Sequence, residues 1–409
     1  MAHAPYRQCY NYSLMQISRL WLLNFRNYEN ATIDFTQNNL LVGPNGAGKT
    51  NILEAIDILA TSRSRIVRGL NKCIRHSQQG FVINGHFGFA PRLRSGLAEY
   101  PRPSSTSSDR VAAAEMTIAF RQERSEERTI KIDEETLART SELIGKVNSV
   151  IFLPGDLDLI RGAPALRRKY LDIIISQTEQ GYYQDLQNYT RALRQRNELL
   201  KNLRWSGGSA PPLGSAQGSL TSRSDQLDVW DTQLAECAGR IMLKRNEYLE
   251  FFARETAELY NTLGFSGTVT LKYKTAVQAD KQKNLEALTA ARAEDLRFGR
   301  THWGVQADDF EFYLDDSKAA EFCSQGQRRL LAIAFKCAEA KIKTEKLKDP
   351  PIVLVDDVLL ELDLERLNKI ISAIAPQSQK IFTVTDTGRF SPDILREMKI
   401  IKIENGRLT

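Results

Sequence analysis

The chain has 409 residues, 42% hydrophobic and 26% charged, a composition typical of a soluble globular protein that is too long for one hydrophobic core. It contains no apolar run near the roughly 18 residues that span a membrane, no signal-peptide core, and no CxxC pair among its five cysteines. These features argue against membrane-spanning and secreted classes and predict a cytoplasmic protein of two lobes.

The first part of the chain predicts strands that lead into a glycine-rich turn and a helix. We set residues 1–14 aside as an N-terminal extension, because Met15 stands directly before the first strand pattern. Apolar residues then predict two strands within 17–35 and a third over 39–42. After the turn, helical spacing joins Ile52, Ala55, Ile56 and Leu59.

The glycine-rich turn matches the P-loop pattern G-x-x-x-x-G-K-[ST]. Its residues are Gly43, Pro44, Asn45, Gly46, Ala47, Gly48, Lys49 and Thr50. Glycines let the backbone curl so that N–H groups point at phosphate oxygens, and the following helix adds its positive dipole end. The turn therefore predicts an ATP site in which Lys49 bridges the β- and γ-phosphates and Thr50 binds Mg²⁺. A chance glycine loop is the alternative, and the strand-to-helix context disfavours it.

A long helical section follows, over about 164–300. Loops rich in Pro, Gly, Ser and Thr are predicted at 91–110 and 207–224. On either side of the second loop, apolar residues recur by threes and fours, which predicts an antiparallel helical hairpin. The seams are Leu186, Tyr189, Leu193, Leu200 and Leu203, then Leu227, Trp230, Leu234, Cys237, Ile241, Tyr248 and Phe251. The pattern fits a coiled-coil arm and an ordinary helical bundle equally well.

The pattern returns to α/β from about residue 311. It predicts a helix after Ser324, strands over 352–355 and 381–384, a helix near 364–374 and a terminal hairpin around 405–406. The α/β head is thus predicted to be split in sequence, as 15–163 and 301–409, with a helical lobe inserted over 164–300.

Two carboxylates end the apolar strand 352–355. Asp356 is placed to hold Mg²⁺ at the end of a buried strand, and Asp357 to act as general base on the attacking water. Taken alone, an apolar strand that ends in two aspartates more often has a structural role than a catalytic one. Together with the P-loop, it predicts the catalytic half of the same site, with Lys49 and Asp357 as catalytic residues.

Ser324, Gly326 and Gln327 precede the next apolar helix, where Ser324 is also a good helix N-cap. The Ser-x-Gly-Gln run ahead of the aspartate strand resembles the signature motif of ABC-type ATPases. The resemblance implies that the signature of one subunit covers the γ-phosphate bound to the P-loop of another, so that hydrolysis needs a dimer. Residues 360–363 resemble the D-loop of that class, while the switch position near Thr385 cannot be aligned.

The wide spacing between the P-loop and the signature resembles the SMC and RecF branch, and the short arm favours the RecF family. Its characteristic stretches stand at 23–28, 51–55, 167–172, 194–197, 227–231 and 324–328. The resemblance implies nucleotide contact by Arg26, an ATP-dependent homodimer, binding of single-stranded or gapped DNA, and recombinase loading with RecO and RecR. Two departures stand out: residues 304–309 lack the family's usual histidine and arginine, and 152–156 lack the glutamine of transporter ATPases.

DNA binding is also indicated by charge. Basic residues exceed acidic ones by 56 to 50, a small excess that slightly favours a polyanionic partner. A candidate phosphate-contacting patch follows the P-loop helix and comprises Arg63, Arg65, Arg68, Lys72 and Arg75. A solvated loop face explains these residues as well. Two other functions stay open, an ABC transporter ATPase subunit and a DNA-binding scaffold with a degenerate ATPase.

Overall fold

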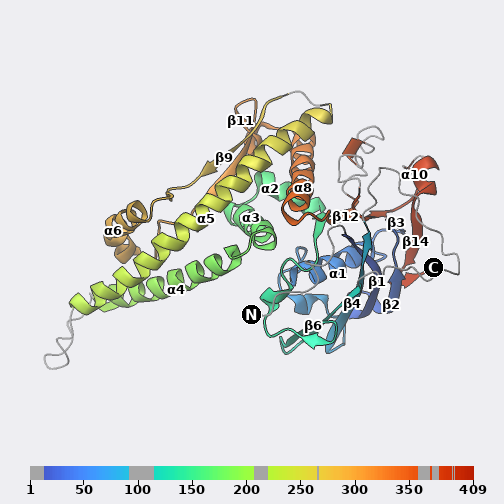
Figure 1. The fold of residues 1–409 in the computed structure, drawn as a ribbon, viewed down its shortest axis with the longest axis horizontal. Helices are drawn as coiled ribbons and strands as arrows, with labels where there is room; N and C mark the ends of the chain where they lie inside the picture. Colours follow the sequence, from blue (N-terminus) through green and yellow to red (C-terminus); the bar gives the residue numbers. More distant parts are fainter. Residues whose placement is uncertain are drawn as a thin grey trace. The chain divides into compact units, whose positions relative to one another are not determined.

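The computed structural model describes residues 13–91, 115–206, 220–264, 267–357, 369–370, 377–388, 390 and 392–409. The chain forms two compact units (Figure 1), of which the first comprises Met1–Asp156 and Lys336–Thr409 and the second Leu157–Phe335. We expected the head to resume at 301. Residues 301–335 instead belong to the second unit, where strand β10 (Asp309–Leu314) pairs with β9 (Val269–Lys274).

The first unit contains an antiparallel sheet in the order β2-β1-β4-β5-β6-β7. Its strands are β1 (Ser13–Phe25), β2 (Tyr28–Asp34), β4 (Gly80–Pro91), β5 (Glu115–Glu123), β6 (Arg128–Ile132) and β7 (Glu135–Thr136). The two strands predicted within 17–35 are confirmed as β1 and β2. Strand β1 already begins at Ser13, so the N-terminal extension predicted over 1–14 is two residues too long.

The second sheet of this unit has the order β15-β14-β3-β13-β12-β8 and is parallel except at the β14–β15 hairpin. Its strands are β3 (Asn38–Val42), β8 (Ser149–Phe152), β12 (Ile352–Asp356), β13 (Lys380–Val384), β14 (Lys399–Glu404) and β15 (Arg407–Leu408). Every residue of β12 and β13 is buried, as expected for parallel strands covered on both faces. The predicted strands and the terminal hairpin are confirmed.

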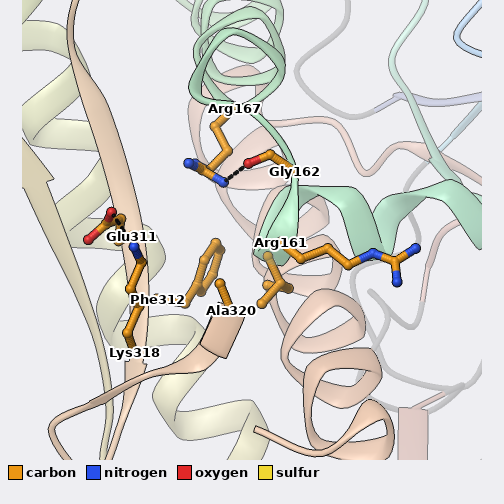
Figure 2. Close-up of a pocket in the computed structure, with 8 residues that line it drawn as sticks. Arg161, Gly162, Arg167, Glu311, Phe312, Lys318 and Ala320 are labelled. Atoms are coloured by element: carbon orange, nitrogen blue, oxygen red, sulfur yellow. Dashed lines mark hydrogen bonds and ion pairs between the residues drawn. The ribbon is translucent and has the colours of Figure 1, made fainter. Parts of the chain in front are cut away.

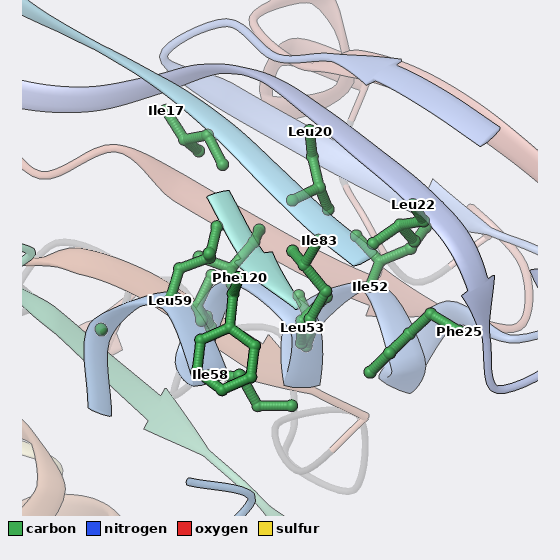
Figure 3. Packing of buried hydrophobic residues seen from close by; sticks show 14 of the residues in the cluster. Ile17, Leu20, Leu22, Phe25, Ile52, Leu53, Ile58, Leu59, Ile83 and Phe120 are labelled. Atoms are coloured by element: carbon green, nitrogen blue, oxygen red, sulfur yellow. The ribbon is translucent and has the colours of Figure 1, made fainter. Parts of the chain in front are cut away.

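Helix α1 (Lys49–Thr61) contacts strands of both sheets, β4 and β5 in one and β8, β12 and β13 in the other. Its residues from Ile52 to Ala60 are all buried, so the helix is enclosed on every side. Figure 3 shows Ile52, Leu53, Ile58 and Leu59 packed among Ile17, Leu20, Leu22, Phe25, Ile83 and Phe120. This packing fixes the start of α1, and with it the P-loop, relative to the ends of the parallel strands.

The second unit is mainly helical. Its elements are α2 (Asp158–Arg161), α3 (Pro164–Thr178), α4 (Tyr182–Ser206), α5 (Leu220–Thr262), α6 (Lys281–Phe298), α7 (Ala319–Phe322) and a three-stranded sheet of β9, β10 and β11 (Ser317–Lys318). Helices α4 and α5 lie side by side as the predicted hairpin (Figure 1). Helix α8 (Gln325–Leu347) begins in this unit, and its residues from Lys336 onward belong to the first. Shorter elements are η1 (Leu70–Cys73), η2 (Thr140–Leu143), η3 (Pro154–Leu157) and α10 (Pro392–Arg396).

The hairpin seam differs from the predicted apolar one. Arg196 of α4 and Asp231 of α5 are buried and paired in it, while the predicted Phe251 is only half-buried and its neighbour Phe252 is enclosed. The predicted seam counted only apolar residues, whereas the ion pair between Arg196 and Asp231 is buried among them. Helix α5 also begins at Leu220, within the stretch expected to be a loop. Several predictions fall wholly or partly outside the described residues: positions 92–110 of the loop expected at 91–110, positions 207–219 of the loop expected at 207–224, the D-loop resemblance at 360–363, and most of the helix near 364–374.

Candidate nucleotide site

The P-loop joins β3 to α1 through backbone that requires glycine. Gly46 and Gly48 have φ angles of 81° and 111°, in the left-handed region that other residues rarely adopt. A Cβ atom at Gly43 would come within 2.1 Å of the Ile403 carbonyl oxygen. The loop is therefore the tight, curled connection that its sequence predicts.

Lys49 is the first residue of α1, and its side chain folds back over the loop. Its Nζ donates hydrogen bonds to the carbonyl oxygens of Gly43, at 2.7 Å, and Pro44, at 3.1 Å. The residue is only 4% exposed. The ammonium group is thus held at the mouth of the glycine loop, where it can exchange carbonyl partners for phosphate oxygens.

Thr50 and Asp356 meet beside the loop, although 306 positions separate them in the chain. The Thr50 hydroxyl donates to Asp356 Oδ1 at 2.7 Å, and Thr383 Oγ1 on the neighbouring strand donates to the same oxygen at 2.9 Å. Burial raises the pKa of the Asp356 carboxyl above its ordinary value, while the hydrogen bonds from Thr50 and Thr383 oppose that rise. A hydroxyl and a carboxylate this close are the oxygen ligands that Mg²⁺ accepts next to a nucleotide.

Asp357 follows at the end of β12 and is half-buried, with a φ of 40°. Its backbone N–H donates to Thr383 Oγ1 at 3.1 Å, so one threonine orients both aspartates. Sequence reasoning missed Thr383. The available signal was its position near the carboxyl end of strand 381–384, since parallel strands end at one edge of the sheet.

Two further residues that the sequence analysis did not assign contact the P-loop, and a third holds one of them in place. Asn27 Nδ2 donates to the Ala47 carbonyl oxygen at 2.8 Å, and the Tyr28 hydroxyl donates to the Gly48 carbonyl oxygen at 3.1 Å. Asn51 Nδ2 donates to Asn27 Oδ1 at 2.8 Å. The turn between β1 and β2 therefore supports the loop from one side.

Arg26 in the same turn has a different partner from the one expected. Its guanidinium makes a two-pronged ion pair with the buried Glu54 of α1, with both N–O distances at 2.8 Å. This pair anchors the turn to the helix. Since the side chain is engaged there, we do not retain Arg26 as a nucleotide contact.

Ser324, Gly326 and Gln327 lie at the start of α8, in the second unit. The Ser324 hydroxyl accepts a hydrogen bond from the Gln327 N–H at 3.2 Å, and Gln327 Oε1 accepts one from the Ser324 N–H at 2.8 Å. This reciprocal capping box confirms the N-cap prediction. Ser324 and Gly326 are exposed and Gln327 is half-buried, and Phe322 just before them is 73% exposed.

The predicted basic patch is only partly exposed. Arg63, Arg68 and Lys72 are exposed, whereas Arg75 is half-buried and pairs with Glu29 at 3.3 Å. Arg65 was wrongly included, since it is mostly buried against Asp57, with Nε and Oδ2 3.3 Å apart. The loop folds back on α1 at Arg65, which a linear list of basic residues cannot show.

A second candidate, a pocket of about 80 Å³ in the second unit, contains several charges that already pair with one another (Figure 2). Arg167 donates to the Gly162 carbonyl and pairs with Asp309, and Lys318 pairs with Glu311. It therefore offers fewer unpaired charges to a ligand than the P-loop does.

Within the described ranges there is no group of three or more His, Cys, Asp or Glu residues that could hold a metal. None of the described helices is both long enough and apolar enough to span a membrane.

Comparisons with known proteins agree over nearly the whole chain. The RecF/RecN/SMC N-terminal domain family matches residues 16–407. A DNA replication and repair protein RecF from Synechocystis sp. is 34% identical over 96% of this chain and 98% of its own length, and one from Synechococcus sp. is 32% identical over 96% and 97%. Among solved structures, the recombination mediator protein RecF with ATP in the RecFOR pathway superposes with a TM-score of 0.81 at 26% identity, covering 98% of this chain and 99% of that one. An Smc head domain from Pyrococcus furiosus shares the fold alone, with a TM-score of 0.51 at 16% identity.

Proposed function

The chain belongs to the RecF family of DNA replication and repair proteins, and from this premise we propose that it is an ATPase whose nucleotide-bound dimer binds DNA. One observation carries the proposal. Lys49, Thr50 and Asp356 come together at the end of a parallel sheet, in the arrangement that binds a nucleoside triphosphate and its cation. The RecF structure with bound ATP supports ATP as the nucleotide.

Each residue of the site has a role in this proposal. The N–H groups of the P-loop and the Lys49 ammonium bind the β- and γ-phosphates, while Thr50 and Asp356 hold Mg²⁺. Mg²⁺ bound there would neutralise charge that develops on the phosphate oxygens. Asp357, oriented through Thr383, accepts a proton from the attacking water.

The second half of the site comes from another copy of the chain. The capping box fixes the first turn of α8, whose free N–H groups and positive dipole end suit a γ-phosphate. A Cβ atom at Gly326 would meet Ser324 Oγ at 3.9 Å as its nearest neighbour, so internal packing does not explain this glycine. We expect the missing side chain to admit the phosphate and the partner's loop.

DNA binds through exposed cations in this proposal. Arg63, Arg68 and Lys72 are joined by the exposed Arg124, whose carbonyl accepts a hydrogen bond from Asn71 of η1 at 3.4 Å. Such residues hold the phosphate backbone without reading sequence. Dimer closure would combine two such surfaces, so DNA affinity should rise with ATP and fall steeply with salt. Single-stranded or gapped DNA, recombinase loading and RecO and RecR as partners follow from the family and from the RecFOR pathway named for its solved structures.

The proposal also places the protein in the cytoplasm. The described cysteines Cys73, Cys237, Cys323 and Cys337 are all free and buried, which suits a reducing compartment.

The test compares two variants. Lys49→Ala should lose ATP binding by about 100-fold or more, because the phosphate charge loses its buried cation. Ser324→Ala should bind ATP normally as a monomer but dimerise and hydrolyse poorly. Equilibrium binding of labelled ATP and light-scattering mass measurement, with and without gapped DNA, would separate these outcomes. A fully ATP-dependent dimer of Ser324→Ala would contradict the role of α8, and an absence of turnover in the wild type with DNA would favour a scaffold.

A further inference from the structure

We propose that Asn27, Tyr28 and Gly406 are positioning residues that aim the backbone N–H groups of Gly48 and Lys49 at the phosphates of the nucleotide. The inference rests on the proposed ATP binding at this loop. It concerns residues that lie outside the P-loop itself, one pair in the β1–β2 turn and one residue in the C-terminal hairpin.

The carbonyl groups of the loop are held from outside. The Ala47 carbonyl oxygen accepts two hydrogen bonds, from Asn27 Nδ2 at 2.8 Å and from the Gly406 N–H at 3.0 Å. The Gly48 carbonyl oxygen accepts one from the Tyr28 hydroxyl at 3.1 Å, in addition to the first backbone bonds of α1. Two successive peptide groups are therefore fixed in orientation.

Because the peptide group is planar, these hydrogen bonds also fix the direction of the N–H groups of Gly48 and Lys49. In a trans peptide the C=O bond and the following N–H bond lie in one plane and point in opposite directions. Holding the Ala47 carbonyl toward Asn27 and Gly406 turns the Gly48 N–H away from them, and holding the Gly48 carbonyl toward Tyr28 does the same for the Lys49 N–H. Two adjacent N–H groups directed to one side form a concave anion site at a helix N-terminus.

The two side chains that hold the loop, Asn27 and Tyr28, are themselves fixed in place. Asn51 Nδ2 donates to Asn27 Oδ1 at 2.8 Å, which leaves the Asn27 amide one orientation in which its NH₂ faces Ala47. Arg26 ties the same turn to Glu54 of α1. Tyr28 is fully buried, and burial raises its pKa, so its hydroxyl stays protonated and remains a donor.

The β1–β2 turn also packs tightly against both Gly48 of the P-loop and Gly406 of the hairpin. A Cβ atom at Gly48 would come within 2.5 Å of Asn27 Nδ2 and 2.9 Å of the Tyr28 hydroxyl. A Cβ atom at Gly406, where φ is 75°, would come within 2.5 Å of the Asn27 carbonyl oxygen. The two glycines thus allow the turn, the loop and the hairpin to touch through their hydrogen-bonding groups.

The alternative is that these residues only fill space. In that case any loss of ATP affinity would follow the loss of folding stability. A positioning role predicts that ATP affinity falls while folding stability is kept, because removal of one donor leaves the fold intact but lets the peptide rotate. It also predicts that the KM for ATP rises while kcat at saturating ATP is nearly unchanged, since the affected groups bind phosphate in the ground state and in the transition state alike.

The experiment uses the full chain with Asn27→Leu, Tyr28→Phe and Gly406→Ala. Asn27→Leu removes the donor without adding charge, and Tyr28→Phe removes a single hydroxyl. Asn30→Leu is the matched control, because Asn30 is exposed on β2 and accepts from Trp21 Nε1. Binding of fluorescently labelled ATP, thermal unfolding and steady-state hydrolysis are measured for each.

The expected result is an affinity about tenfold weaker for Asn27→Leu and about threefold weaker for Tyr28→Phe, as loss of single hydrogen bonds implies, with Asn30→Leu unchanged. Gly406→Ala keeps the N–H but displaces it from Ala47, because the new Cβ would meet the Asn27 carbonyl oxygen, and its affinity should fall as in Asn27→Leu. Wild-type affinity in folded Tyr28→Phe and Gly406→Ala would overturn the inference, as would a fall in kcat at unchanged KM. If the wild type itself failed to bind ATP, the proposed function would fall together with this inference, whereas normal wild-type binding with unaffected variants would overturn this inference alone.

Discussion

The P-loop site of the first unit and the helices of the second unit bury charge in different ways. In the first unit, Asp356 is buried at the P-loop with hydroxyl partners, and burial raises its pKa, so its negative charge is poorly compensated. In the second unit, buried charges face charges of opposite sign. The P-loop site therefore holds a buried negative charge that a cation can stabilise, while the helical unit uses its charges to hold helices together.

Arg196 is the clearest case in the helical unit. It is fully buried on α4 and bonds to Asp231 of α5, at 2.5 Å, to Asp295 of α6, at 2.6 Å, and to the Thr301 hydroxyl, at 2.8 Å. A second buried arginine, Arg245, pairs with Asp172 and Asp308. Such pairs add little net stability over apolar packing, but they allow only one register between the helices.

The largest expected effect comes from breaking this pairing. Arg196→Ala leaves Asp231 and Asp295 buried without their shared cation and should cost about 3–5 kcal/mol of unfolding free energy. Arg194→Ala, an exposed position on the same helix, is the control and should change stability by less than about 0.5 kcal/mol. Urea unfolding followed by circular dichroism measures both. Equal stability of the two variants would mean that the buried network is dispensable.

Asp356→Asn should change the free energy of unfolding in the opposite direction from Arg196→Ala. Because the folded-state pKa of Asp356 is raised, its ionised form is disfavoured in the folded protein, and its contribution to stability is lost as pH rises through that pKa. Removing the charge should therefore leave the nucleotide-free protein equally or more stable at pH 7, while Mg²⁺-dependent hydrolysis falls about 100-fold or more. Thermal unfolding and phosphate release are the measurements.

The exposed Asp393→Asn serves as the control for both readouts. Strong destabilisation of nucleotide-free Asp356→Asn would show that its carboxylate is structural and that the P-loop site, like the helical unit, gains stability from its buried charge.

The smallest effect on stability is expected for exposed cations. Arg63→Ala, Arg68→Ala and Lys72→Ala should leave unfolding unchanged, and each should lower the slope of log affinity against log salt by about 0.7–0.9 for DNA. Arg65→Ala should behave differently, losing stability because Asp57 is left buried without its partner. DNA binding by fluorescence anisotropy at several salt concentrations would check this. An unchanged salt slope in all three exposed variants would place the DNA surface elsewhere.

Consecutive residues by themselves determined the P-loop, the strand that ends in Asp356 and the cap at Ser324. In each, the physical requirement is local: a left-handed glycine, a continuous apolar run, or a hydroxyl three residues from an N–H. Only the tertiary structure decided that Thr383 orients both aspartates, that Arg26 and Arg65 pair with acidic residues of α1, and that Asn27 holds Ala47. These contacts join separate elements, and a residue's own neighbours in sequence do not specify which side chain will face it across a packed interface.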